Sequence, residues 1–209
     1  MKTFQKEALA ALDKQHRTNL INALAGIRPA NLIGSISENK ITNLAIFNSV
    51  MHIGADPALM GFIMRPTHVN RDTFVNIETI QEFTINHVPV TAIASAHQTS
   101  ARYLVSEFEA CGFTPEYSSL IKAPYVAESV IQIGLKLAEI IPIQSNQTKL
   151  IIGEVQEIRI KNEACITPDY SINLSIANSI GVNGLDTYYT LSKEATFKYA
   201  KPDQKPEQI

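Results

Sequence analysis

Basic and hydroxyl side chains gather in one stretch of the chain, at the point where a short apolar run ends. The stretch contains Arg65 and Arg71, together with the polar residues Thr67, Asp72 and Thr73. Backbone amides and a hydroxyl at the start of a helix can donate hydrogen bonds to a phosphate, and arginines neutralise its charge. The spacing therefore predicts an anion site. Without a ligand, the same residues would be a helix cap and solvated surface charges.

The motifs of several common enzyme classes are absent from the sequence. It contains no glycine-rich dinucleotide loop, no Walker loop and no nucleophile elbow. None of the histidines stands at metal-ligand spacing with another histidine or with a cysteine; they are His16, His52, His68, His87 and His97. We therefore expect neither a hydrolase nor a structural metal, and no catalytic acid or base is assigned. Cys111 and Cys165 are expected to be buried thiols.

Short strands and a few helices must position the anion site. Strands are expected over apolar and β-branched runs at residues 30–37, 41–47, 59–64, 83–88, 130–141 and 149–160. Helices are expected over residues 4–25 with a break near 16–18, over 73–81 with Asp72 as N-cap, and over most of 90–111, which Gly112 ends. Several short strands with helices between them predict an α+β fold built on a small antiparallel barrel.

Composition limits the class of protein. The chain has 209 residues, of which 45% are hydrophobic and 18% charged, enough for a real core. We divide it into an N-terminal helical segment (1–26), a barrel domain (27–192) and a C-terminal tail (193–209). A net charge of −2 without long charge runs argues against nucleic acid as a partner. The absence of a signal-like or membrane-spanning run predicts a soluble cytoplasmic protein with no membrane partner.

A longer ordered pattern, over roughly residues 20–160, resembles the flavin reductase-like family. It comprises Arg28–Ala30, Thr42–Val50, Asp56–Leu59, Arg65–Pro66, Arg71–Thr73, Asn76–Ile77, Glu82–Asn86, Lys122–Ser129, Glu139–Pro142 and Ile151–Val155. The resemblance implies a split β-barrel, Greek-key-like and with peripheral helices, that forms a homodimer and holds FMN near the subunit interface. It also implies redox activity with NADH or NADPH, or with another flavoprotein.

The resemblance further implies a set of FMN-binding residues: Asn43, Asn48, Ser49, Val50, Met51, His52, Arg65, Thr67, Arg71, Asp72, Thr73, Asn86 and His87. A strand from residue 43 to 50 would line the isoalloxazine ring. Both arginines and both threonines of the set would hold the phosphate, with Asp72 orienting the loop. Asn86 could equally be a strand residue bonded to backbone, and His52 an ordinary half-buried histidine.

The C-terminal part departs from the family pattern. Many relatives have a basic residue before a Gly-Gly and a tyrosine near the C-terminus, whereas residues 179–189 of this chain contain no arginine. Because that segment often closes over the flavin, the departure weakens the expectation of nicotinamide docking more than that of FMN binding. Tyr188 or Tyr189 could shield the ring or simply pack.

Three functions stay open at this point. The first is an FMN-dependent oxidoreductase that takes hydride from NADH or NADPH and passes electrons to a small molecule or a flavoprotein. That chemistry belongs to the cofactor, so missing catalytic dyads are no objection. The second is an FMN-binding electron carrier or sensor that docks a protein partner. The third is a split barrel that has lost its flavin.

Overall fold

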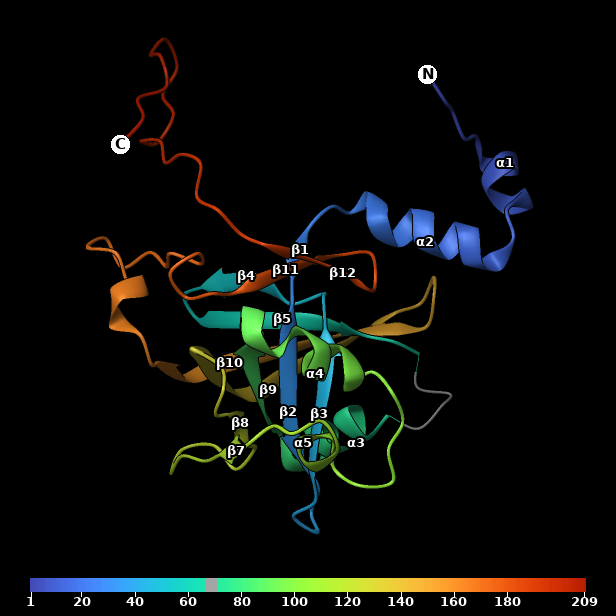
Figure 1. Cartoon of the computed structure of the whole chain (residues 1–209), viewed down its shortest axis with the longest axis vertical. Coiled ribbons are helices and arrows are strands. Elements are labelled where there is room, and N and C mark those ends of the chain that lie inside the picture. The colour runs from blue at the N-terminus through green and yellow to red at the C-terminus, as the bar shows by residue number, and fades with distance from the viewer. Residues whose placement is uncertain (67–70) are drawn as a thin grey trace.

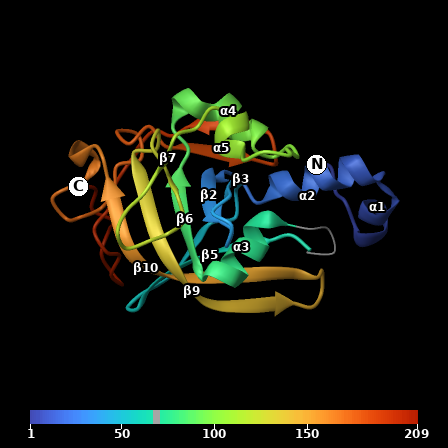
Figure 2. The ribbon, with the colours of Figure 1, turned by 90° about the horizontal axis from the view of Figure 1, so that it is seen from below.

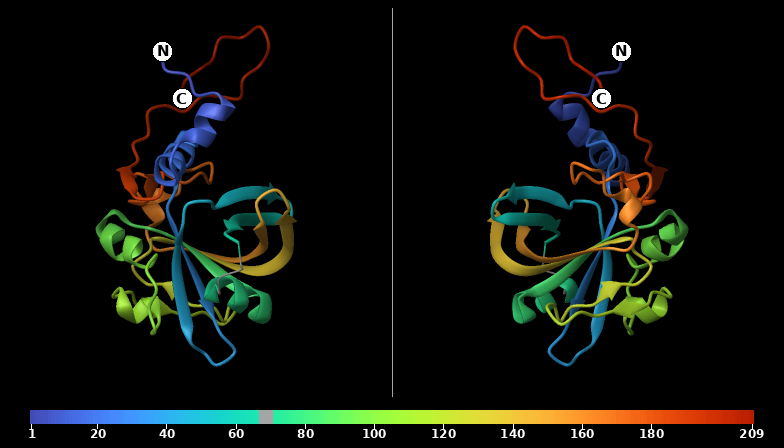
Figure 3. Two further views of the ribbon diagram at one scale, coloured as in Figure 1. Left: turned by 90° about the vertical axis from the view of Figure 1, so that its right-hand side faces the viewer. Right: turned by 90° about the vertical axis from the view of Figure 1, so that its left-hand side faces the viewer.

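The fold is built around one seven-stranded antiparallel sheet. The computed structural model describes residues 1–66 and 71–209. The strand order is β3-β2-β6-β9-β10-β5-β4. The strands are β2 (Asn31–Ile36), β3 (Thr42–Phe47), β4 (Met51–Ala55), β5 (Ala58–Met64), β6 (Glu82–His87), β9 (Ile131–Ile143) and β10 (Thr148–Ile160). The sheet curls without closing, so β3 and β4 remain edges (Figure 3). The expected α+β split barrel is confirmed.

The long β9–β10 hairpin gives the sheet much of its curvature. The register of this pair shifts at Ile152/Gly153 and at Val155/Glu157, and such bulges increase local twist. A side chain at Gly153 would bring its Cβ within 2.6 Å of the Phe83 ring. Glycine at this position therefore lets β10 pass close over an aromatic residue of the core.

Two apolar clusters lie on opposite faces of the sheet. Ile33, Phe62 and Phe83 belong to the cluster inside the barrel, and Leu32 belongs to the one outside. The neighbours Leu32 and Ile33 enter different clusters because successive strand residues point to opposite faces. The period-two alternation read from the sequence thus corresponds to a sheet that is covered on both sides.

Helices and smaller strands surround the barrel. They are α1 (Lys6–Ala11), α2 (Lys14–Leu24), α3 (Asp72–Ile80), α4 (Ile93–Gln98) and α5 (Glu107–Ala110), the 3-10 turns η1 (Val90–Ala92) and η2 (Glu163–Cys165), and the short strands β1 (Arg28–Pro29), β7 (Pro115–Glu116), β8 (Tyr125–Val126), β11 (Ile180–Asn183) and β12 (Thr187–Thr190). Helices α1 and α2 contain no buried residue. They extend from the same end of the barrel as the C-terminal tail (Figure 1).

Several element boundaries differ from the sequence-based expectation. The N-terminal helix breaks at Leu12–Asp13 rather than near 16–18, because Asp13 accepts hydrogen bonds from the amides of Gln15 and His16 and begins a new helix. The expected helix over 90–111 is three short pieces with residues 99–106 outside any helix, and Ser106 caps the last piece. Strand β4 was missed because it is almost entirely exposed and lacks an alternating burial pattern.

Two further expectations concern single residues. Gly112 follows α5 with φ of +73°, as a glycine that ends a helix should. Cys111 and Cys165 are buried and unpaired. In the part of the chain that the structure describes, no helix is long and apolar enough to cross a membrane.

Candidate functional site

A buried polar cluster joins β2, β3 and the first turn of α3. The Asn43 side-chain amide donates to the Thr73 hydroxyl at 2.9 Å and to the Ser35 hydroxyl at 3.2 Å. The Asn76 amide also donates to Ser35, at 3.2 Å. All four residues are buried. Buried polar groups hold a fixed geometry once they are paired, so this cluster fixes the start of α3 against the sheet.

The start of α3 differs from the expected cap. Arg71, with φ −130° and ψ 97°, occupies the N-cap position, and Asp72 is the first helical residue. The expectation that Asp72 is the N-cap is therefore wrong. A guanidinium has no acceptor, so Arg71 supplies no side-chain cap to the amides at the helix start. Those amides form the positive end of the helix, where an anion is stabilised.

The Arg71 guanidinium adds an unpaired donor at the same place. Its Nε is buried and has no hydrogen-bond partner among the described residues. A buried donor without an acceptor is costly, and a phosphate oxygen would satisfy it with a charge-assisted bond. Arg65 is exposed directly after β5 and can add a second positive charge. The residues present therefore fit a phosphate, while Thr67 lies outside the described residues.

The residues expected at the flavin ring are largely engaged within the protein. The Asn48 amide donates to the Gly184 carbonyl at 2.8 Å. The Ser49 hydroxyl accepts from the Ile63 amide at 3.0 Å and donates to the Ile63 carbonyl at 3.3 Å. Val50 is buried in the barrel core. Strand β3 ends at Phe47, before these residues, so residues 48–50 form the link between β3 and β4.

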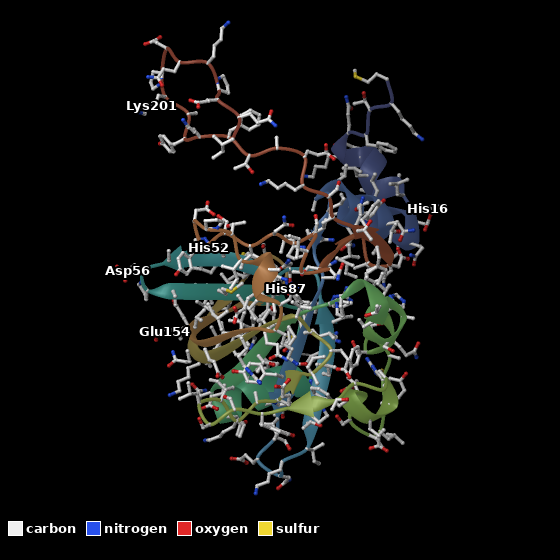
Figure 4. All side chains as sticks on the ribbon, turned by 60° about the vertical axis from the view of Figure 1, so that its left-hand side comes forward. His16, His52, Asp56, His87, Glu154 and Lys201 are labelled. Atoms are coloured by element: carbon white, nitrogen blue, oxygen red, sulfur yellow. The ribbon has the colours of Figure 1, made fainter. Side chains whose placement is uncertain are left out.

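The last two residues of that group lie on β4. Met51 and His52 are exposed on this edge strand. Figure 4 shows His52 on the outer hairpin, whereas His87 lies within the body of the protein. The two histidines therefore belong to different environments.

Asn86 performs a structural role. It is fully buried, and its amide donates to the Leu32 carbonyl at 3.1 Å and to the Thr84 hydroxyl at 2.9 Å. Its carbonyl oxygen accepts from the Val126 amide at 3.0 Å. Because these three bonds use both N–H groups and the oxygen, we leave Asn86 out of the site that we propose.

His87 lies at one end of the barrel interior, two strands from the β3 edge. Its Nδ1 is 3.0 Å from the Ser179 hydroxyl. Burial lowers the pKa of His87 to about 4, so the ring is neutral at pH 7. Its partner in the sheet register is Asn31, whose buried amide nitrogen and oxygen both have no partner among the described residues.

Side chains cover part of the β3 edge. The Glu107 carboxylate accepts from the Leu44 amide at 3.1 Å, and the Thr99 hydroxyl accepts from the Ile46 amide at 3.0 Å. Burial raises the pKa of Glu107. A hollow of about 260 Å³ beside it is lined in part by Asp72 and Glu107. The two carboxyl groups disfavour a phosphate inside this hollow.

The C-terminal hairpin brings a basic residue near residues 48–50. Arg28 donates through Nη2 to the Gly184 carbonyl at 2.9 Å, and the same carbonyl accepts from Asn48. Arg28 comes from β1, so its place beside the hairpin follows from the pairing of β1 with β11 and could not be read from local spacing. The Tyr188 hydroxyl lies 2.9 Å from His97 Nδ1, and the two rings meet edge to face. Tyr188 therefore packs against α4.

A model of a known protein family matches most of the chain. The model of the flavin reductase like domain matches residues 27–170. The chain belongs to this family. Family membership supports a flavin-related oxidoreductase and agrees with the open barrel described above.

Several solved structures share the fold of this chain. One is a protein from Shewanella frigidimarina NCIMB 400, inferred to be a flavin reductase with a split barrel domain. It is 42% identical to this chain, with a TM-score of 0.92, and the match spans 96% of this chain and 100% of the other. Nitrilotriacetate monooxygenase component B from Bacillus cereus is 21% identical, with a TM-score of 0.81 over 93% of this chain and 97% of its own. An FMN-binding protein from Thermus thermophilus is 14% identical, with a TM-score of 0.72 over 96% of this chain and 100% of its own.

Proposed function

We propose that this protein binds FMN, with the phosphate at the start of α3, and acts as an FMN-dependent oxidoreductase that takes hydride from NADH or NADPH. The observation that carries the proposal is the buried, unpartnered Nε of Arg71 at a helix start whose N-cap residue offers no acceptor. The name of the Thermus thermophilus relative, an FMN-binding protein, supports FMN as the flavin.

The chain's own residues would bind and orient the cofactor. Arg71 and Arg65 would neutralise the phosphate, and Asn43 would hold Thr73 and the helix start in place. Residues 48–52 would line the ring, chiefly through backbone groups because Asn48, Ser49 and Val50 are engaged internally. When bound, FMN would supply the hydride-accepting chemistry, which needs orientation more than a protein acid or base.

Exposed apolar surface supports the proposed homodimer. Met51 and Ile53 on β4 are 38% and 37% exposed, and Ile21 and Leu24 on α2 are 50% and 71% exposed. Large apolar side chains grouped on an edge strand and on an unpacked helix are typical of surfaces that a partner covers. We propose that a second copy covers them, that the protein acts in the cytoplasm, and that a small molecule or a flavoprotein accepts its electrons.

A second candidate is an FMN-binding electron carrier or sensor with little nicotinamide activity. The observation that favours it is the C-terminal hairpin, where Arg28 already donates to the carbonyls of Asn22 and Gly184. Tyr188 is likewise engaged, with His97. These contacts use the Arg28 Nη2 and the Tyr188 hydroxyl, so these two groups are already engaged within the protein.

One experiment separates these functions. The purified protein is supplied with FMN, its visible spectrum is recorded, and NADH or NADPH is added without oxygen. A yellow protein that either nucleotide bleaches supports the oxidoreductase. A yellow protein that neither bleaches supports the carrier, and a colourless protein that takes up no FMN contradicts both.

A further inference from the structure

A lysine from a distant strand reaches the start of α3. Lys149, at the beginning of β10, is paired in register with Met64, the residue before Arg65. The Lys149 ammonium lies 4.2 Å from the centre of the Phe74 ring, and Phe74 belongs to the first turn of α3. Figure 2 shows α3 beside the β9–β10 hairpin. Lys149 therefore lies between the end of β5, which Arg65 follows, and the first turn of α3, which Arg71 precedes.

No carboxylate pairs with Lys149 among the described residues. Elsewhere in this part of the chain lysines do form ion pairs, as Lys161 does with Glu116 and Lys198 with Glu207. The Lys149 side chain is partly buried, and an ammonium near the positive end of a helix is disfavoured by the helix dipole. The Phe74 ring offsets part of this cost through a cation–π contact.

The charges around the helix start remain unbalanced even when its acids are counted. Arg65, Arg71 and Lys149 contribute three positive charges, whereas Asp72 in the first turn and Glu107, which lines the same hollow, are the acids. A phosphate monoester carries about −1.5 to −2 at pH 7 and would neutralise the excess of positive charge. A flavin without a phosphate brings no charge to this place.

We propose that Lys149 is a third cationic ligand of the phosphate and makes the site selective for a flavin that ends in a phosphate monoester. This assignment rests on the proposed function. The Lys149 ammonium lies over the Phe74 ring, which restricts the side chain, and its N–H groups that point away from the ring can still donate to an anion. Riboflavin, which has the same ring system but no phosphate, is the natural comparison.

The test measures FMN and riboflavin affinities separately, by quenching of flavin fluorescence on flavin-free protein. Lys149→Met keeps an unbranched stem against Phe74 but removes the charge, Lys149→Gln is a second neutral variant, and Lys149→Arg keeps the charge. Lys136→Met is the matched control, because Lys136 is exposed on the same hairpin and pairs in register with Glu82 and Glu154. Circular dichroism melts show which variants are folded.

We expect both neutral variants to bind FMN about 10- to 100-fold more weakly, with riboflavin affinity unchanged. Lys149→Arg should retain most of the FMN affinity, and Lys136→Met all of it. Unchanged FMN affinity in a folded neutral variant would overturn the assignment of Lys149 but not the proposed function. An equal loss of affinity for FMN and for riboflavin would do the same. A wild-type protein that binds no FMN would overturn the proposed function and this assignment with it.

Discussion

The Asn43 amide donates to the Thr73 hydroxyl at 2.9 Å, across 30 positions of sequence, and thereby ties β3 to the first turn of α3. Both residues are buried, at 8% and 6% exposure, so the bond is shielded from water. It connects the strand that leads to the proposed ring site with the helix that begins at the proposed phosphate site. The bond thus links the two ends of the proposed site.

Thr73→Val removes the hydroxyl of this pair while keeping the shape of the side chain. The Asn43 amide then loses one of its acceptors in a buried place, so we expect the free energy of unfolding to fall by about 1–2 kcal/mol. Chemical denaturation measures this change. Thr190→Val, on the exposed strand β12, is the control and should change stability by less than about 0.5 kcal/mol. Equal effects of the two substitutions would contradict the structural role of the pair.

Arg71→Ala removes the guanidinium with the unpartnered Nε. We expect the FMN binding free energy to weaken by about 1.5–3 kcal/mol, because a charge-assisted bond to phosphate is lost. Flavin fluorescence titration measures it. Arg102→Ala removes an exposed arginine outside the site and should leave FMN affinity unchanged. If Arg71→Ala also leaves the affinity unchanged, Arg71 does not bind the cofactor.

Protonation of His87 should make stability depend on pH. Its pKa in the folded protein is lowered to about 4 by burial, whereas an unfolded histidine titrates near 6.5. Between these values only the unfolded chain binds the proton, so the free energy of unfolding falls as pH falls through this window. The full loss would be up to about 3 kcal/mol.

Urea denaturation of wild-type and His87→Asn proteins at pH 7 and pH 4.5 tests this linkage. The stability advantage of the wild type should shrink on going to the lower pH, because asparagine does not titrate. His52→Asn serves as the control, since His52 is exposed on β4. A wild-type advantage that is the same at both values would show that His87 contributes no such linkage.

Glu107 offers a test of the covered β3 edge. Its carboxylate accepts from the Leu44 amide, and burial raises its pKa above that of the unfolded chain. The free energy of unfolding therefore falls as pH rises through the titration of this group. Glu107→Gln keeps an acceptor and removes the ionisation, and we expect it to be at least as stable as wild type at pH 7. Glu107→Ala leaves the amide without its acceptor and should cost about 1–2 kcal/mol in denaturation experiments. Equal losses in the two variants would contradict this role.

The sheet could be predicted from the sequence because its signals are local. Alternation in β2 sends Leu32 and Ile33 to opposite clusters, and the two long apolar runs pair as β9 and β10. The family pattern supplied the open barrel. Strand β4 gave no such signal because it is exposed along nearly its whole length.

The candidate site was harder to predict because its contacts join distant parts of the chain. Asn86 looked like a cofactor residue by position, but the bond to Val126 that engages its oxygen depends on how the short strand β8 packs on β6. The places of Arg28 and Lys149 follow from the pairing of β1 with β11 and of β5 with β10. Sequence spacing shows neither of these pairings.

A crystal structure of the protein with FMN tests the central claim most directly. We predict phosphate oxygens within about 3 Å of the Arg71 guanidinium and of backbone amides at the start of α3. A phosphate bound elsewhere, with no contact to Arg71 or to the first turn of α3, would contradict the account.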